Sequence, residues 1–156
     1  MEKRPLPLLI ALVFLFCIQH GFSQSNEVLD GLLEQEQATM GNAAYLVFLA
    51  SGIAAEEWSP DRSFEELRSR DWGFDEADAA SVVDLGSLSF MIMQAFEMKG
   101  GIMYSLFPGK RYAARELAYL GFVPGNTSPY RVVSGQEVTH ILGRTLDHLG
   151  QREVNQ

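Results

Sequence analysis

The sequence predicts an all-α protein, a compact helical bundle of two tandem helix-loop-helix repeats with one further helix at the N-terminal side. Three observations lead to this prediction. Apolar residues recur with the helical period of about 3.6 residues in several stretches. Residues that favour helix starts precede these stretches, and glycines follow several of them. One amphipathic pattern occurs twice, over residues 82–96 and 132–146.

The N-terminal residues have the pattern of a secretory signal peptide. Lys3 and Arg4 precede an apolar run over residues 8–18, and small or polar residues follow up to Ser23, which is the order typical of such peptides. We expect residues 1–23 to be removed and the protein to be exported to the periplasm or the cell surface. A signal anchor is less favoured, because a membrane span needs roughly 20 apolar residues. Lipid attachment at Cys17 is also less favoured, because the bulky Phe16 precedes it.

The remaining chain is predicted to be a single acidic domain without a disulfide. Residues 24–150 form this helical domain, and the hydrophilic residues 151–156 are expected to fray. Cys17 is the one cysteine in the sequence, so its removal leaves no thiol to oxidise. The chain has 12 Lys and Arg residues against 20 Asp and Glu residues, a net charge of −8. This balance disfavours nucleic acid and strongly anionic membranes as partners.

Two helices are expected in the first part of the domain. Asn26 is a plausible N-cap for a helix with an apolar side, formed by Val28, Leu29, Leu32 and Leu33. Thr39 is a plausible cap for a second helix that stops at Gly52, where a residue free to adopt positive φ is favoured. This second helix is apolar on most sides, so we expect it inside the bundle.

The middle of the chain predicts a short helix and then a strongly apolar one. Ser59 and Pro60 form a typical helix start, a cap followed by proline, and this helix is expected to end near residues 72–73. Asp84 caps the next helix, which is expected to end at residues 100–101. Its apolar side has the i, i+3, i+4, i+7, i+8 spacing of a buried helix face and comprises Leu88, Met91, Ile92, Ala95 and Phe96.

The last part of the domain mirrors the first. Periodicity does not decide between strand and helical turn for residues 102–107, because the run is too short. Residues 112–120 predict a helix closed by Gly121, and Ser134 caps the final helix. The two long patterns align as Asp84 with Ser134, Leu88 with Val138, Met91 with Ile141, Ile92 with Leu142 and Phe96 with Leu146. This alignment gives repeat one over about residues 39–100 and repeat two over about residues 109–150.

The second repeat resembles an S-layer homology module. Such a module has an Ala/Leu-bearing helix, a Gly followed by a large aliphatic residue, a loop, and then a Val-Thr-Arg-Ala-Glu-Phe motif that opens an amphipathic helix. The corresponding residues here are Leu117, Gly121, Phe122, Val133, Ser134, Glu137, Val138, Ile141, Leu142, Arg144 and Leu146. The resemblance implies an extracytoplasmic helical bundle, usually of three modules, that binds cell-wall polysaccharide or peptidoglycan. The motif arginine after the cap is replaced by Gly135 and by Leu85.

The loop before the final helix carries the candidate binding residues. Tyr130 and Arg131 precede Ser134 and Glu137. An aromatic ring can stack on a sugar, and the free N–H groups of a helix N-terminus can bind an anionic or hydroxylated group. We therefore expect these four residues to bind glycan or a partner protein.

Other reactive residue types fit structural roles better. His140 and His148 have Arg144 between them at the i+4 position where a metal site needs a ligand, so we expect a solvated or partner-facing surface there. Trp58 and Trp72 are expected to cover the core. The methionines are expected to fill the core as well, and any exposed ones to mark a partner groove; they are Met91, Met93, Met98 and Met103.

These patterns together predict a non-enzymatic binding module of the cell envelope. We expect no catalytic residues, no cofactor, no metal, no nucleic acid and no transmembrane segment in the mature chain. The resemblance implies attachment to cell-wall glycan or peptidoglycan. The alternative is a protein-interaction or assembly subunit of an envelope or surface apparatus, indicated by the excess of apolar and Met residues in repeat one.

Overall fold

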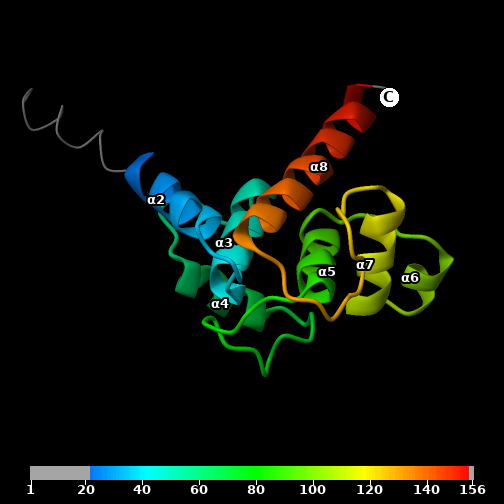
Figure 1. The fold of residues 1–156 in the computed structure, drawn as a ribbon, viewed down its shortest axis with the longest axis horizontal. Helices are drawn as coiled ribbons and strands as arrows, with labels where there is room; N and C mark the ends of the chain where they lie inside the picture. The colour runs from blue at the N-terminus through cyan, green and yellow to red at the C-terminus, as the bar shows by residue number, and fades with distance from the viewer. Residues whose placement is uncertain (1–21, 155–156) are drawn as a thin grey trace, which may run out of the picture.

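The computed structural model describes residues 22–154 and confirms the all-α prediction. The predicted signal peptide falls on residues 1–23 and thus lies almost wholly outside the described residues. In the described part, no helix is both long and apolar enough to cross a membrane. Figure 1 shows the helices gathered around α3 and α5, with α2 and α6 at opposite ends. The described helices are α2 (Phe22–Leu33), α3 (Met40–Ala50), α4 (Pro60–Ser69), α5 (Leu85–Ala95), α6 (Ile102–Leu106), α7 (Lys110–Tyr119) and α8 (Gly135–Val154).

The helix starts predicted at Thr39, Ser59 and Asp84 are confirmed. Each residue is an N-cap in extended conformation whose side chain accepts a hydrogen bond from a backbone N–H three residues later. The distances are 3.5 Å from Asn42, 3.2 Å from Arg62 and 2.6 Å from Ser87. These bonds satisfy N–H groups that have no partner inside the helix. The Asn26 cap is wrong, because α2 begins at Phe22 and includes that residue.

The predicted glycine stops at Gly52 and Gly121 are confirmed in geometry. Both residues have φ of +75°, a conformation that glycine adopts without steric cost. The next N–H then bonds back into the helix, from Ile53 to the Phe48 carbonyl and from Phe122 to the Leu117 carbonyl, both at 2.9 Å.

Several helix ends differ from the predicted ones. α4 ends at Ser69, before the expected residues 72–73, and α8 includes residues 151–154 of the expected tail. α5 ends at Ala95 instead of at the Gly100–Gly101 pair, because Glu97 already takes the left-handed conformation with φ of +49°. The Met98 N–H then bonds to the Met93 carbonyl at 2.9 Å, as the equivalent amides do after Gly52 and Gly121. The undecided residues 102–107 contain the short helix α6.

The substitution Glu97→Gly is expected to stabilise the protein by about 1 kcal/mol, because a side chain in the left-handed region costs roughly that much or more, partly offset by the freedom of glycine in the unfolded chain. Chemical denaturation of both proteins measures the difference. Lys99→Gly is the control, since Lys99 is not among the positive-φ residues of residues 22–154. A Glu97→Gly variant less stable than the parent would contradict the role given to this helix end.

The three residues that precede the N-caps of α3, α5 and α8 form a closed ring of hydrogen bonds. The Val83 N–H donates to the Ala38 carbonyl at 2.9 Å, the Ala38 N–H to the Val133 carbonyl at 2.9 Å, and the Val133 N–H to the Val83 carbonyl at 3.2 Å. All three side chains are fully buried. The segments before α3, α5 and α8 therefore occupy equivalent places around a pseudo-threefold axis, and we call these three bonds the capping ring.

Each of these helices also docks its first N–H onto the segment that leads into the next one. The Met40 N–H of α3 donates to the Ser81 carbonyl at 2.8 Å, and the Leu85 N–H of α5 donates to the Arg131 carbonyl at 2.8 Å. The circle closes where the Gly135 N–H of α8 donates to the Gln35 carbonyl at 3.0 Å. N–H groups that a helix leaves unpaired are thus used to hold the three units together.

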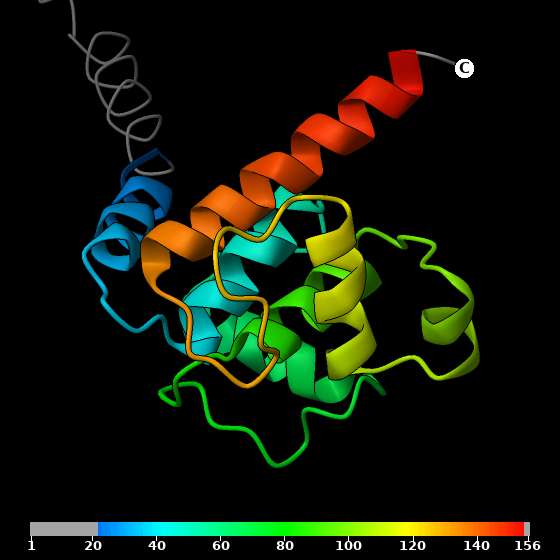
Figure 2. The ribbon, with the colours of Figure 1, turned by 45° about the vertical axis from the view of Figure 1, so that its right-hand side comes forward.

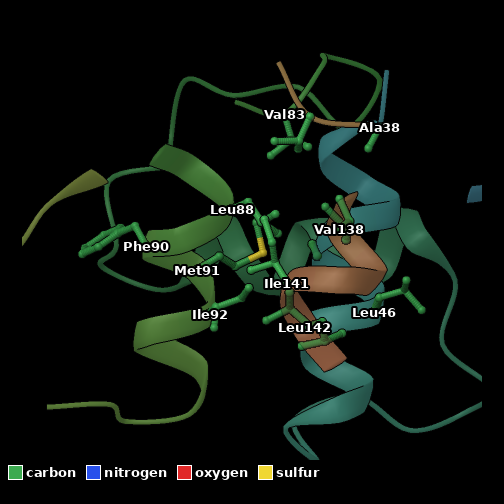
Figure 3. Close-up of a cluster of buried hydrophobic side chains, with 14 of the residues drawn as sticks. Ala38, Leu46, Val83, Leu88, Phe90, Met91, Ile92, Val138, Ile141 and Leu142 are labelled. Carbon is green, nitrogen blue, oxygen red and sulfur yellow. The ribbon is translucent and has the colours of Figure 1, made fainter. Parts of the chain in front are cut away.

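The core repeats the same symmetry. Positions four and eight residues after each cap are buried, so one apolar stripe from each capped helix enters a shared centre. Figure 3 shows the side chains of α5 and α8 facing each other, with Ala38 and Val83 together at one end of the cluster. The equivalent sets are Ala43, Leu88 and Val138, and then Val47, Ile92 and Leu142.

The two helices matched in the sequence thus fill two of three equivalent places, and α3 fills the third. A further helix packs against each capped one: α4 against α3, α7 against α5, and α2 against α8. The additional N-terminal helix expected from the sequence is therefore the partner of the last helix in the chain. Figure 2 shows α2 beside the start of α8, which crosses the body and projects at its C-terminal end.

Candidate functional site

The loop between α7 and α8 brings three of the four predicted site residues together. Ser134 is positioned to cap α8, and Glu137 lies in its first turn. The Glu137 N–H donates to Ser134 Oγ at 3.2 Å, and the Ser134 N–H donates to Glu137 Oε2 at 3.1 Å. This reciprocal arrangement is a capping box, and its Ser-x-x-Glu spacing is a sequence signal from which the pairing could have been predicted.

Arg131 completes this cluster through the same carboxylate. Its Nη2 atom lies 2.8 Å from Glu137 Oε1, with the two side chains 17% and 28% exposed. Its Nε–H also donates to the Asn126 carbonyl, which ties the loop together. Burial would raise the pKa of the Glu137 carboxyl, but the Arg131 hydrogen bond, the Ser134 N–H and the Arg131 charge outweigh it and lower that pKa. Glu137 is therefore held ionised beside the helix start.

The start of α8 is closed in part by the chain itself, so fewer of its N–H groups than expected are free for an anionic ligand. The N–H groups of Ser134, Gly135 and Glu137 all have partners within the protein. The nearby carboxylate of Glu137 also repels an incoming anion. Ser134 and Glu137 thus organise the loop, and the part of the predicted site that faces solvent is Tyr130, whose side chain is 79% exposed.

The residue that follows each N-cap of α3, α5 and α8 is also inaccessible to a ligand. Met40, Leu85 and Gly135 are all buried. A Cβ atom added at Gly135 would lie 1.7 Å from the Leu32 carbonyl oxygen, which is closer than van der Waals contact allows. The side chain that S-layer homology modules place here as arginine therefore has no room in α8, because the end of α2 occupies it.

The outer face of the capping ring is a surface that the sequence did not indicate. Ala38, Val83 and Val133 turn their side chains into the core, and the residues before them turn theirs to solvent. These are Gln37, Val82 and Val132, and all three are exposed. Tyr130 belongs to the segment that carries Val132. Since the ring depends on contacts between distant segments, no local pattern predicts this face.

The described part of the chain also has open hollows away from this loop, among them the following two. The first has a volume of about 480 Å³ and is lined by Gly73, Phe74, Asp75, Glu76, Ala77 and Lys110. Lys110 Nζ lies 4.6 Å from the centre of the Phe74 ring, an attractive cation–π contact. The second has about 420 Å³ along the end of α8 and is lined by Leu146, Asp147, Gly150, Gln151 and Val154.

The two histidines and two tryptophans considered in the sequence form no further site in the described residues. His148 packs edge-on against Phe122, with ring centres 5.4 Å apart, while His140 is exposed. No group of three His, Cys, Asp or Glu side chains that could hold a metal occurs within residues 22–154. Trp58 and Trp72 are partly buried against the core, as expected.

The tryptophan faces are also partly covered by arginines. The Arg62 guanidinium lies 4.4 Å from the Trp58 ring centre, and the Arg70 guanidinium lies 5.1 Å from the Trp72 ring centre. These cation–π contacts compete with a sugar for the same ring faces. Tyr130 is therefore better placed than either tryptophan to stack on a glycan.

Comparison of the chain with protein-family models, with curated proteins and with solved structures gives no match.

Proposed function

We propose that this protein is a non-enzymatic binding module of the cell envelope that attaches to cell-wall glycan or peptidoglycan. The capping ring is the observation that carries this proposal. S-layer homology modules usually occur in threes and form an all-helical bundle, and the ring joins three equivalently capped helices. The sequence resembles that family well in the second repeat and more loosely in the first, and the first repeat contains two of the three capped helices, α3 and α5.

The ligand is proposed to bind at the outer face of the capping ring, through Tyr130. The motif arginine of the family is absent, and the three equivalent positions are buried, so binding uses a different group. Tyr130 presents an exposed aromatic ring on a loop that the Arg131–Glu137 ion pair holds in place. Because the loop that carries the ring is already ordered, less conformational entropy is lost when a sugar stacks on it.

Sedimentation with purified peptidoglycan sacculi tests the proposal. The protein is expected in the pellet, and Tyr130→Ala is expected to weaken binding roughly ten-fold, because an aromatic contact contributes up to about 1.5 kcal/mol beyond its buried area. Tyr119→Ala is the matched control, since Tyr119 is a tyrosine on α7 that is 88% exposed, against 79% for Tyr130. A parent protein that stays wholly in the supernatant refutes glycan attachment.

The second candidate function is that of an assembly subunit of an envelope or surface apparatus. Met91 and Met93 are buried in the core, so they give no support to a partner groove. What supports this alternative is the set of exposed apolar side chains on α6. A pull-down from envelope extracts that recovers no stoichiometric protein partner would count heavily against it.

A further inference from the structure

Four apolar side chains on and beside α6 are exposed at one end of the molecule. They are 50–78% exposed, and we call them the α6 surface: Ile102, Met103, Leu106 and Phe107. Figure 1 shows α6 at the periphery, beside α7 and away from the core helices. Such a cluster on one short segment indicates an interaction site rather than scattered exposed residues.

The helix that presents this surface is firmly held. Its buried residue, Tyr104, packs edge-on against Phe90 with ring centres 6.3 Å apart and accepts a hydrogen bond from Gln94 at 3.0 Å. A Cβ atom on Gly100 would lie 2.6 Å from the Tyr104 ring, so the chain passes close beneath it. These contacts hold α6 against the body of the protein, with its other apolar side chains turned outward.

The charge around the α6 surface is opposite to that of the whole protein. Residues 98–115 contain four of the 12 Lys and Arg residues and none of the 20 Asp and Glu residues. These cations are exposed, and the ion pairs found in residues 22–154 do not include them. Glu97 and Glu116 border the segment, with the Glu116 carboxylate beside Gly101, and Lys110 lies against Phe74 near Asp75 and Glu76. The positive charge beside the α6 surface therefore comes from Lys99, Arg111 and Arg115, which outnumber Glu97 and Glu116. The four cations are Lys99, Lys110, Arg111 and Arg115.

We propose that the α6 surface inserts into the interface of a membrane that contains anionic phospholipid. The apolar side chains enter the acyl boundary, and the cations that flank them bind the phosphate groups of the lipids. The net negative charge of the chain disfavours contact with such a membrane through most other faces. The net charge of the sequence disfavours anionic membranes as partners of the protein as a whole, but this does not apply to the end that carries α6.

A lipid surface fits this site better than a folded protein partner does. Each of the four side chains of the α6 surface is at least half exposed, so this surface offers protruding side chains rather than a pocket for an anchor residue. Protein interfaces derive much of their affinity from such pockets. Insertion into lipid needs protruding apolar groups with adjacent cations, which is what α6 and its flanks provide.

Fluorescence of a Phe107→Trp variant of the full chain tests insertion at this position. Vesicles of equal parts phosphatidylcholine and phosphatidylglycerol, some with brominated acyl chains, are expected to shift its added emission to the blue and to quench it. Val154→Trp is the matched control, at an exposed apolar residue near the end of α8, and its added emission is expected to stay unquenched. An unquenched Phe107→Trp variant, or quenching at position 154 alone, overturns the proposal.

The contribution of charge is tested with the same vesicles and a double variant. Arg111→Gln with Arg115→Gln is expected to lower the partition coefficient about five-fold per residue, since each cation near an anionic surface contributes on the order of 1 kcal/mol. Arg68→Gln with Arg144→Gln is the control, with the same change in charge at exposed residues elsewhere. Equal losses in both pairs, or self-association through Phe107 without vesicle binding, would overturn the assignment.

Discussion

Replacing Gly135 with alanine is expected to destabilise the protein by about 3 kcal/mol, because the added Cβ would overlap a tightly packed neighbour. That neighbour is the Leu32 carbonyl oxygen, 1.7 Å from the ideal Cβ position. Backbone cannot rotate aside as a long side chain can, so α2 must move away from α8. The Gly135 hydrogen bond to Gln35 is then strained as well. Chemical denaturation measures the loss.

The matched control lies in the same helix. A Cβ atom at Gly143 meets nothing within 4 Å, so Gly143→Ala is expected to stabilise α8 by about 0.5–1 kcal/mol through reduced freedom of the unfolded chain. If Gly135→Ala lowers the free energy of unfolding and Gly143→Ala raises it, contact with α2, and not helix propensity, decides the effect at Gly135. A Gly135→Ala protein as stable as its parent would show that α2 does not pack against this helix start.

Replacing Ile141 with alanine is expected to destabilise the protein by about 3 kcal/mol, because removal of a buried aliphatic side chain leaves a cavity in addition to the lost burial. Ile141 is fully buried, and Figure 3 shows it beside Met91 and Leu142 at the junction of α5 and α8. Thermal or chemical denaturation provides the measurement.

Leu146→Ala is the control for this substitution. Leu146 lies on the same helix but is 42% exposed, so its removal is expected to cost less than about 1 kcal/mol. Similar losses of stability in Ile141→Ala and Leu146→Ala would mean that the apolar side of α8 is not packed between the other capped helices.

The local features of the fold could be predicted from the sequence. The caps at Thr39 and Asp84 and the stops at Gly52 and Gly121 depend on residues within one helical turn, so short patterns specify them. The end of α5 was predicted wrongly, because Glu97 adopts a conformation that usually belongs to glycine.

The threefold arrangement was not predicted, because it depends on distant segments. The matching patterns over residues 82–96 and 132–146, each of which begins with two valines, made two of the units visible in the sequence. The third has Gln37 and Ala38 in the same places, and no short pattern relates that pair to Val-Val. Its equivalence rests on which carbonyl each buried N–H reaches, and those partners lie far along the chain.

The candidate site was predicted in part. Tyr130, Arg131, Ser134 and Glu137 were expected to share one loop region, and three of them do form one cluster. The pairing of Ser134 with Glu137 follows from their Ser-x-x-Glu spacing, whereas the ion pair of Arg131 with Glu137 depends on the course of the loop, which residue spacing alone does not specify. The exposed outer face of the capping ring and the α6 surface likewise required knowledge of burial.

Amide hydrogen exchange at Ala38, Val83 and Val133 tests most directly that these three units close into one ring. Each of these amides donates a hydrogen bond in the capping ring, so all three are expected to exchange only through global unfolding, with one common free energy. An Ala38 amide that exchanges much faster than those of Val83 and Val133 would contradict the ring, because the segment after α2 would then open independently of the other two units.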